Sequence, residues 1–195
     1  MRCDVTIYFI RHGETDWNAH SRYQGQADVP MNAKGLTQAR RNGRTLRTLL
    51  PDIAGFRFIA SPLGRARRTM EIVREELGLV PHTYETDERL KELHYGHWQG
   101  QLAEHLPALD APGVEARARD TFRWRPNGGE SYEDLMVRSV KWLTEMDRNA
   151  VVAAHGGVGR VLRGHLYGID PAEVPELPVP QDRILVLRRD GMEWI

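Results

Sequence analysis

Short apolar runs and longer amphipathic stretches alternate along this chain. Four runs, rich in β-branched or aromatic residues, have the length of buried strands and cover residues 5–10, 56–60, 150–154 and 184–187. Apolar residues recur at helical spacing in residues 32–50, 66–77, 132–146 and 159–167. Because strands alternate with helices, the pattern predicts a layered α/β sandwich.

Several residues indicate where the predicted helices begin and end. Ser61 and Pro62 offer an N-cap and a first-turn proline for the helix that closes at Gly78. Ser131, with Asp134 three residues on, forms a weaker relative of the capping box. These residues predict where two of the helices begin.

The middle of the chain is less regular. Residues 82–90 favour an extended segment, and residues 92–100 indicate an aromatic-rich, structured loop. Residues 101–126 contain Pro107 and Pro112 and show the weakest periodicity. We interpret them as a small insertion or lid that reaches to about residue 130.

Length, charge and cysteine content narrow the class of protein. The 195 residues fit one domain that carries the insertion. With 27 basic and 27 acidic residues, no net field favours nucleic acid or an anionic membrane surface. No apolar stretch approaches the roughly 18 residues that span a bilayer. The single Cys3 cannot form an intrachain disulfide, and a signal-peptide pattern is absent, so we expect a cytoplasmic protein. The sequence contains no pattern that indicates an oligomeric state.

Two histidines follow two of the predicted strands in the same way. His12 follows the first apolar run together with Arg11, and His155 follows the third. Arg65 comes shortly after the second run. Ligands collect at the carboxyl ends of strands in open α/β sheets. If these strands are neighbours, the four side chains form one anion pocket.

These residue types suit phosphoryl transfer. A neutral imidazole is a nucleophile near physiological pH, so His12 can accept a phosphoryl group. The transferring group gathers negative charge and needs fixed cations and donors, for which Arg11, Arg65 and His155 are candidates. Glu92 begins the aromatic loop, where desolvation can keep a carboxylic acid protonated for the leaving group.

Uncharged donors lie on the same loop as His12. Amide, hydroxyl and backbone N–H groups bind phosphate oxygens without adding charge. The candidates are Thr15, Asn18, Gln24 and Gly25. They would complement the arginines in one phosphate pocket.

Residues 11–18, RHGETDWN, closely resemble the opening motif of the histidine phosphatase superfamily, which includes cofactor-dependent phosphoglycerate mutases. The resemblance continues in the same order through residues 61–69, 90–100 and 155–157. It implies a three-layer α/β/α sandwich with a mixed, mainly parallel sheet and a small lid insertion.

The resemblance also implies roles for individual residues. His12 would take the phosphoryl group as a phosphohistidine, Arg11, Arg65 and His155 would complete the pocket, and Glu92 would donate the proton. The further phosphate and substrate contacts would be Asn18, Gln24, Gly25, Tyr95 and Gly156. Such a protein is expected to act on a small phosphomonoester without a metal or another cofactor.

The resemblance leaves phosphatase and mutase activity open. The family's mutases carry an adjacent arginine pair in a longer insertion, whereas this chain has separated arginines, Arg117, Arg119, Arg123 and Arg125. A bisphosphate that reorients while bound needs a second anion site, so this departure favours a phosphatase. Against it, residues 92–96 are similar to the mutase loop, and Gln99 stands where many phosphatases have glutamate. A mutase would use 2,3-bisphosphoglycerate as a primer.

Two further alternatives are weaker. A non-catalytic module that binds a phosphorylated protein or metabolite is disfavoured because every proposed catalytic residue is present. A zinc site made from His12, Glu14, Asp16 and His155 is disfavoured because no His-x-x-x-His or Cys-x-x-Cys spacing occurs, and Arg11 would repel the ion.

Overall fold

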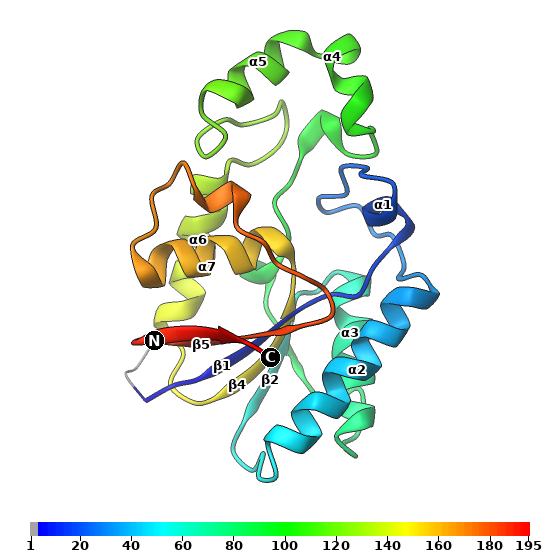
Figure 1. Ribbon diagram of the computed structural model, residues 1–195, viewed down its shortest axis with the longest axis vertical. Helices are drawn as coiled ribbons and strands as arrows, with labels where there is room; N and C mark the ends of the chain where they lie inside the picture. Colours follow the sequence, from blue (N-terminus) through cyan, green and yellow to red (C-terminus); the bar gives the residue numbers. More distant parts are fainter. Residues whose placement is uncertain (1–3) are drawn as a thin grey trace.

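The computed structural model describes residues 4–195 and consists of a central sheet with helices packed against it (Figure 1). Its six strands are β1 (Ile7–Arg11), β2 (Arg57–Ala60), β3 (Glu85–Thr86), β4 (Ala150–Ala154), β5 (Ile184–Arg188) and β6 (Gly191–Trp194). The order is β3-β2-β4-β1-β5-β6. The first four strands in this order pair in parallel. β5 pairs antiparallel with β1 on one side and with β6 on the other. The predicted α/β fold with a mixed, mainly parallel sheet is confirmed.

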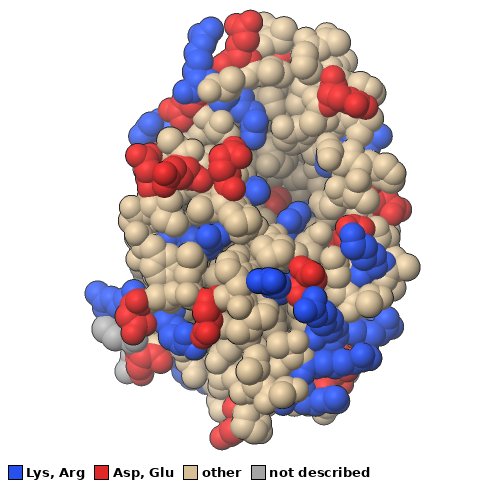
Figure 2. Space-filling view, in the orientation of Figure 1, with Lys and Arg blue, Asp and Glu red and all other residues tan. Residues whose placement is uncertain are grey.

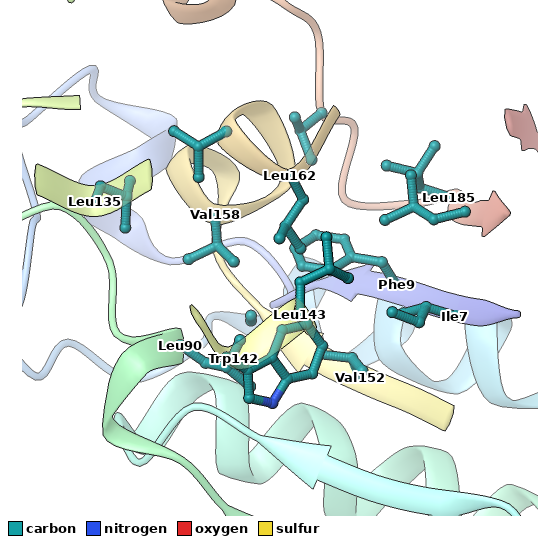
Figure 3. Packing of buried hydrophobic residues seen from close by; sticks show 14 of the residues in the cluster. Ile7, Phe9, Leu90, Leu135, Trp142, Leu143, Val152, Val158, Leu162 and Leu185 are labelled. Carbon is teal, nitrogen blue, oxygen red and sulfur yellow. The ribbon is translucent and has the colours of Figure 1, made fainter. Parts of the chain in front are cut away.

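One face of the sheet packs against α6 (Tyr132–Thr144) and α7 (Gly156–Tyr167). Phe9 of β1 and Val152 of β4 share a buried cluster with Trp142 of α6 and Leu162 of α7. Figure 3 shows these apolar side chains in contact between the strands and the two helices. This cluster forms the larger of the two cores.

The other face packs against α2 (Ala33–Leu49) and α3 (Gly64–Glu76). Ile10 and Val151, which neighbour the residues of the first core along β1 and β4, lie in a second cluster with Leu46 and Met70. Successive side chains of a strand point to opposite faces, and strands buried on both faces read as continuous apolar runs. This double burial produces the predicted three layers.

Two predicted helix boundaries are wrong. α3 begins at Gly64 after Leu63, which contributes no side-chain cap, so Ser61 and Pro62 do not start this helix. Asp28 Oδ1 accepts a hydrogen bond from Gly64 N at 3.0 Å, and a different loop therefore caps the helix. α7 begins at Gly156, three residues earlier than the sequence pattern indicates.

The capping prediction for α6 is confirmed. Ser131 accepts from Asp134 N, and the Asp134 carboxylate accepts from the backbone of Ser131. At α2, the Asn32 side chain accepts from Gly35 N, without a reciprocal side-chain bond. Both helices are therefore anchored at the ends that their sequences indicate.

Residues 101–130, which we call the lid segment, are more regular than expected. They contain a 3-10 turn (Ala103–His105), α4 (Leu106–Leu109) and α5 (Ala111–Arg119). The prolines interpreted as interruptions lie in the first turns of α4 and α5, where the missing N–H has no helical partner to lose. Figure 1 places both helices at one end of the molecule, away from the sheet.

Short elements complete the structure. They are α1 (Asp16–Ala19) and 3-10 turns at Glu88–Leu90, Gly96–Trp98 and Val174–Glu176. Of the predicted extended segment 82–90, only β3 is a strand. Within residues 4–195, no helix combines the length and apolarity needed to cross a membrane. Cys3 lies outside the described residues, so its lack of a disulfide stays a prediction.

Candidate active site

Neighbouring parallel strands end at the same edge of the sheet. Arg11 of β1 pairs in register with Ala154 of β4, and β2 lies on the other side of β4. His12 and His155 are the next residues along β1 and β4, and their ring centroids lie 5.1 Å apart. The prediction that these strands are neighbours is confirmed, and it brings the two histidines together.

His12 is buried and presents one ring nitrogen to its surroundings. Nδ1 lies 2.8 Å from Gly13 O and donates its proton to that carbonyl. Nε2 accepts from Arg65 Nε at 3.2 Å. Burial, together with Arg65 and Arg11, lowers the pKa of His12 well below its usual value. The imidazole is therefore neutral at physiological pH, with its lone pair on Nε2.

His155 is completely buried, and the ring nitrogen that it hydrogen-bonds is Nε2, in contrast to Nδ1 in His12. Nε2 lies 2.7 Å from Ser61 Oγ, and Leu63 N donates to the same oxygen at 3.4 Å. Burial and nearby Arg65 lower the pKa of His155 well below its usual value. Nδ1 has no hydrogen-bond partner in residues 4–195. A neutral His155 that accepts the Ser61 proton at Nε2 carries its own proton on Nδ1.

Two buried arginines supply positive charge beside His12. Arg65 is 1% exposed, and its Nη1 and Nη2 donate to Ala27 O and Gly25 O at 2.7 and 2.6 Å. Arg11 Nη1 donates to Val179 O at 2.8 Å, while its buried Nε has no partner in the described chain. Burial lowers the pKa of Arg65 to about 10 and also lowers that of Arg11, so both stay cationic at neutral pH. Carbonyl oxygens orient these guanidinium groups without cancelling their charge.

The loop after β1 positions Arg65 and corrects one expectation. Gln24 Nε2 donates to Thr15 Oγ1 at 2.8 Å, and Gln24 Oε1 then accepts from Arg65 Nη1 and Nε at 2.9 and 3.0 Å. Thr15 is fully buried and caps α1 by accepting from Asn18 N. Thr15 therefore lies outside the cavity lining, and its hydroxyl already bonds to Gln24 and Asn18.

Asn18 keeps a donor group free for the site. Its Oδ1 accepts from Thr15 N at 3.3 Å and from Gln181 Nε2 at 3.1 Å. These two bonds fix the amide so that Nδ2 is the group left to bind a ligand. Asn18 also lines the cavity that Arg11, His12 and Arg65 share, in agreement with the predicted location.

Glu92 lies on a loop that is braced from two sides. Gly157 N donates to its Oε1 and Oε2 at 3.1 and 3.2 Å, and Leu93 N donates to Oε1 at 2.9 Å. A Cβ at position 157 would lie 2.3 Å from Glu92 Oε1, so this approach requires glycine. Arg138 of α6 donates to Glu92 O at 3.0 Å and pairs with Glu130 at 3.0 Å. Arg138, which sequence reasoning missed, therefore fixes the loop that carries Glu92.

These side chains meet at a cavity of about 270 Å³. It is lined by Arg11, His12, Asn18, Ser21, Arg22, Tyr23, Gln24, Gly25, Arg65, Glu92, Tyr95, Ala103, Gly156 and Arg160. Every predicted site residue is included except Thr15 and His155, and the ring centroid of His155 lies 5.1 Å from that of His12. Figure 2 shows a hollow below the lid segment with basic and acidic atoms at its floor.

Sequence reasoning missed two arginines of this cavity. Arg160 lies one turn into α7, four residues after Gly156. Residues four apart share a helix face, so a correct start for α7 would have placed Arg160 beside Gly156. Arg22 follows α1, whose four residues are too few to show a periodic pattern.

The zinc alternative finds no ligand set in the part of the chain that the structure describes. There, no three His, Cys, Asp or Glu side chains are grouped as metal ligands. Glu14 pairs with Lys34 at 2.7 Å, and Asp16 accepts from Asn32 Nδ2 at 3.3 Å. These carboxylates therefore serve the start of α2.

Comparison with known proteins agrees with this geometry. The profile of the Histidine phosphatase superfamily (branch 1) matches residues 7–195. A glucosyl-3-phosphoglycerate phosphatase of Mycobacterium tuberculosis is 35% identical over 184 residues, which cover 88% of this chain and 79% of that protein. A 2,3-bisphosphoglycerate-dependent phosphoglycerate mutase of Gloeobacter violaceus is 29% identical over 180 residues, which cover 89% and 80%.

Solved structures point the same way. A mycobacterial glucosyl-3-phosphoglycerate phosphatase in complex with VO3 is similar at a TM-score of 0.79 and 32% identity, over 98% of this chain and 96% of that chain. The chain belongs to branch 1 of the histidine phosphatase superfamily and is an enzyme of that family. Its relatives include both phosphatases and mutases.

Proposed function

We propose that this enzyme is a metal-independent phosphomonoesterase that acts on a small phosphorylated metabolite through a phosphohistidine. The observation that carries the proposal is the neutral His12, whose Nε2 lies beside the cationic Arg65 and Arg11 at the floor of one cavity. Glu92 lines the same cavity, and we assign it the role of proton donor to the leaving group. The relatives named as phosphatases, one of them a glucosyl-3-phosphoglycerate phosphatase, support this assignment.

In the first step, His12 Nε2 attacks phosphorus and forms a P–N bond while the ester P–O bond breaks. The carboxyl proton of Glu92 moves to the departing alcohol oxygen. Arg11, Arg65 and the Nδ1–H of His155 bind the phosphoryl oxygens, which carry the most charge in the transition state. The hydrogen bond from Nδ1 to Gly13 O stabilises the positive charge that His12 acquires.

In the second step, water attacks phosphorus and the P–N bond breaks. The Glu92 carboxylate accepts the proton of that water and is ready for the next cycle. Inorganic phosphate leaves, and His12 returns to its neutral form. Backbone N–H groups of Leu93 and Gly157 hold the carboxylate, chiefly through Oε1, so Oε2 is the oxygen better placed to exchange a proton.

The lid segment supports hydrolysis over mutase chemistry. Arg119, Arg123 and Arg125 pair with carboxylates of Glu115, Asp120 and Asp134 at 3.5, 3.3 and 2.6 Å. These three arginines therefore lie outside the cavity, whereas Arg117, the fourth arginine of the segment, lines a neighbouring pocket together with Tyr23 and Ala103. A bisphosphate that reorients between the two phosphoryl transfers of one turnover would need a second anion site inside the cavity.

Product analysis tests the proposal. We expect 3-phosphoglycerate, with catalytic 2,3-bisphosphoglycerate present, to yield mainly glycerate and inorganic phosphate, and a chelator to leave the rate unchanged. Rapid formation of 2-phosphoglycerate would identify a mutase instead. Tight binding of phosphomonoesters across a metabolite panel, without turnover of any, would identify a binding module. His12→Ala is the matched control for background hydrolysis.

A further inference from the structure

A short segment before β5 lies against the arginines of the site. Residues 177–181, which we call the strap, follow the 3-10 turn Val174–Glu176 and lead toward β5 (Figure 1). Three consecutive carbonyl oxygens of the strap each accept a hydrogen bond of 2.8 Å from an arginine: Leu177 O from Arg160, Pro178 O from Arg163 and Val179 O from Arg11. Because Arg11 and Arg160 line the cavity, the strap is tied directly to its wall.

The strap ends at Gln181, whose main chain is anchored to a helix on the other side. Gln181 O accepts from Asn42 Nδ2 at 3.1 Å, and Asn42 is a buried residue of α2. Gln181 itself is half-buried and does not line the cavity. Its side chain therefore starts from a fixed point outside the cavity, and any effect that it has on a ligand passes through other residues.

The side chain of Gln181 joins the nucleophile to Asn18. Its Nε2 donates to His12 O and to Asn18 Oδ1, both at 3.1 Å. A backbone carbonyl only accepts hydrogen bonds, so the part of the Gln181 amide that faces His12 O is the NH2 group. The main chain of His12 thereby fixes the orientation of the Gln181 amide.

The orientation of Asn18 follows from that of Gln181. Asn18 Oδ1 accepts from Gln181 Nε2 and, at 3.3 Å, from Thr15 N. Both partners only donate, so Oδ1 is the atom that they hold, and Nδ2 is left for the cavity that Asn18 lines. With the amide reversed, Oδ1 would meet the phosphoryl oxygens, and acceptor would face acceptor.

We propose that Gln181 is a positioning residue for phosphoryl transfer, which holds the Asn18 amide so that Nδ2, and not Oδ1, meets the phosphoryl oxygens. Donors that are oriented before the reaction stabilise the transition state without a further cost of reorganisation. This inference rests on the proposed function. It adds a residue outside the cavity that determines which end of Asn18 the substrate meets.

Two substitutions of Gln181 separate loss of its bond from reversal of the Asn18 amide. Gln181→Met is of similar length but donates no hydrogen bond, and it should lower kcat/KM for p-nitrophenyl phosphate about 10-fold. Gln181→Glu introduces a carboxylate, which accepts from Asn18 Nδ2 and turns Oδ1 toward the phosphoryl group. This variant should lose about 100-fold, the range of one lost transition-state donor. Arg183→Gln makes the same change in net charge at an exposed neighbouring position and should stay within about twofold of wild type.

A double-mutant cycle with Asn18 separates positioning from damage to the fold. Asn18→Ala removes the donor and should itself lose about 100-fold in kcat/KM. In this background, Gln181→Glu and Gln181→Met should each cost no more than about threefold, because no amide remains to be oriented. Thermal unfolding checks each variant, and if Gln181→Glu does not fold, the cycle with Gln181→Met makes the same test.

Equal losses with and without the Asn18 side chain would overturn the inference and leave the phosphatase intact, as would a Gln181→Glu variant no worse than Gln181→Met. Failure of the wild-type enzyme to hydrolyse any phosphomonoester would instead reject the proposed function. Calorimetric titration with inorganic phosphate would then still test Gln181, because phosphate presents the same oxygens to Asn18. Gln181→Glu should weaken phosphate binding about 10-fold when Asn18 is present, and leave it unchanged in Asn18→Ala.

Discussion

His12 and His155 follow adjacent parallel strands at the same level, yet a different ring nitrogen of each is hydrogen-bonded to the protein. In His12, Nδ1 is bound to Gly13 O and Nε2 is exposed to the site. In His155, Nε2 is bound to Ser61 Oγ and Nδ1 has no partner in the described structure. One ring therefore offers a lone pair, and the other offers a proton.

This difference assigns unlike roles to two residues with similar sequence surroundings. A lone pair beside two arginines suits nucleophilic attack on phosphorus. A buried N–H suits binding of a phosphoryl oxygen. Each role is set by one hydrogen-bond partner on the opposite ring nitrogen, and variants of the two histidines should therefore fail in different ways.

His12→Ala should have the largest effect. Removal of the nucleophile eliminates the two-step route, so kcat should fall by at least about 10⁴-fold. A steady-state assay with a phosphomonoester measures this loss, and thermal unfolding controls for the fold. Activity within tenfold of wild type would show that another group attacks phosphorus.

His155→Ala should be damaging but less severe. It removes a preorganised donor to the transition state, worth about 10²- to 10³-fold in kcat. The variant should still form a phosphoenzyme, at a reduced rate, in rapid-quench experiments. Complete loss of phosphoenzyme formation would contradict the division of roles between the two histidines.

Gly157→Ala should separate proton transfer from phosphoryl binding. The added methyl would lie 2.3 Å from Glu92 Oε1, and displacement of that carboxyl should lower kcat about 10²-fold for alkyl phosphates. p-Nitrophenyl phosphate needs little help from an acid, so its phosphorylation burst should slow much less. Gly191→Ala, where no atom lies within 4 Å of the added Cβ, is the matched control. If the phosphorylation rates of the alkyl phosphate and of p-nitrophenyl phosphate fell equally, Glu92 would act in binding the substrate and not in donating a proton.

The free energy of unfolding should depend on pH through the two buried imidazoles, His12 and His155. Burial lowers the pKa of His12 and His155 in the folded protein, whereas the unfolded chain titrates near about 6.5. The unfolded state therefore takes up protons first as the pH falls. The stabilisation is complete above about pH 6.5 and declines below it, by up to about 1.4 kcal/mol per pH unit for each ring.

Urea unfolding between about pH 7.5 and pH 5.5 measures this slope. His155→Ala should flatten it, whereas the exposed His105 gives a control variant, His105→Ala, with the wild-type slope. An identical slope in His155→Ala would mean that His155 takes up its proton in the folded state as well.

Local patterns in the sequence predicted four of the six strands and the charged residues that follow β1 and β4. Apolar runs ending in Arg11-His12 and in His155 predicted both strands and the residues at their ends, because strand length and burial are short-range properties. Which ring nitrogen of His155 is hydrogen-bonded was not predictable, since the partner is Ser61, 94 positions away.

The misses also have physical causes. The capping role of Thr15 was not predicted because it requires α1, a helix too short to leave a periodic pattern. Arg160 was missed because Gly156 and Gly157 concealed the true start of α7. The lid helices were missed because Pro107 and Pro112 resemble interruptions unless the first turn of each helix is known.

The position of the trapped phosphoryl group tests the central claim most directly. A phosphomonoester labelled with ³²P is mixed with the enzyme, quenched in alkali and digested, and the modified residue and ring nitrogen are identified by mass spectrometry and ³¹P NMR. The account predicts an acid-labile adduct on Nε2 of His12. A phosphoryl group on His155, or on Nδ1 of His12, would contradict it.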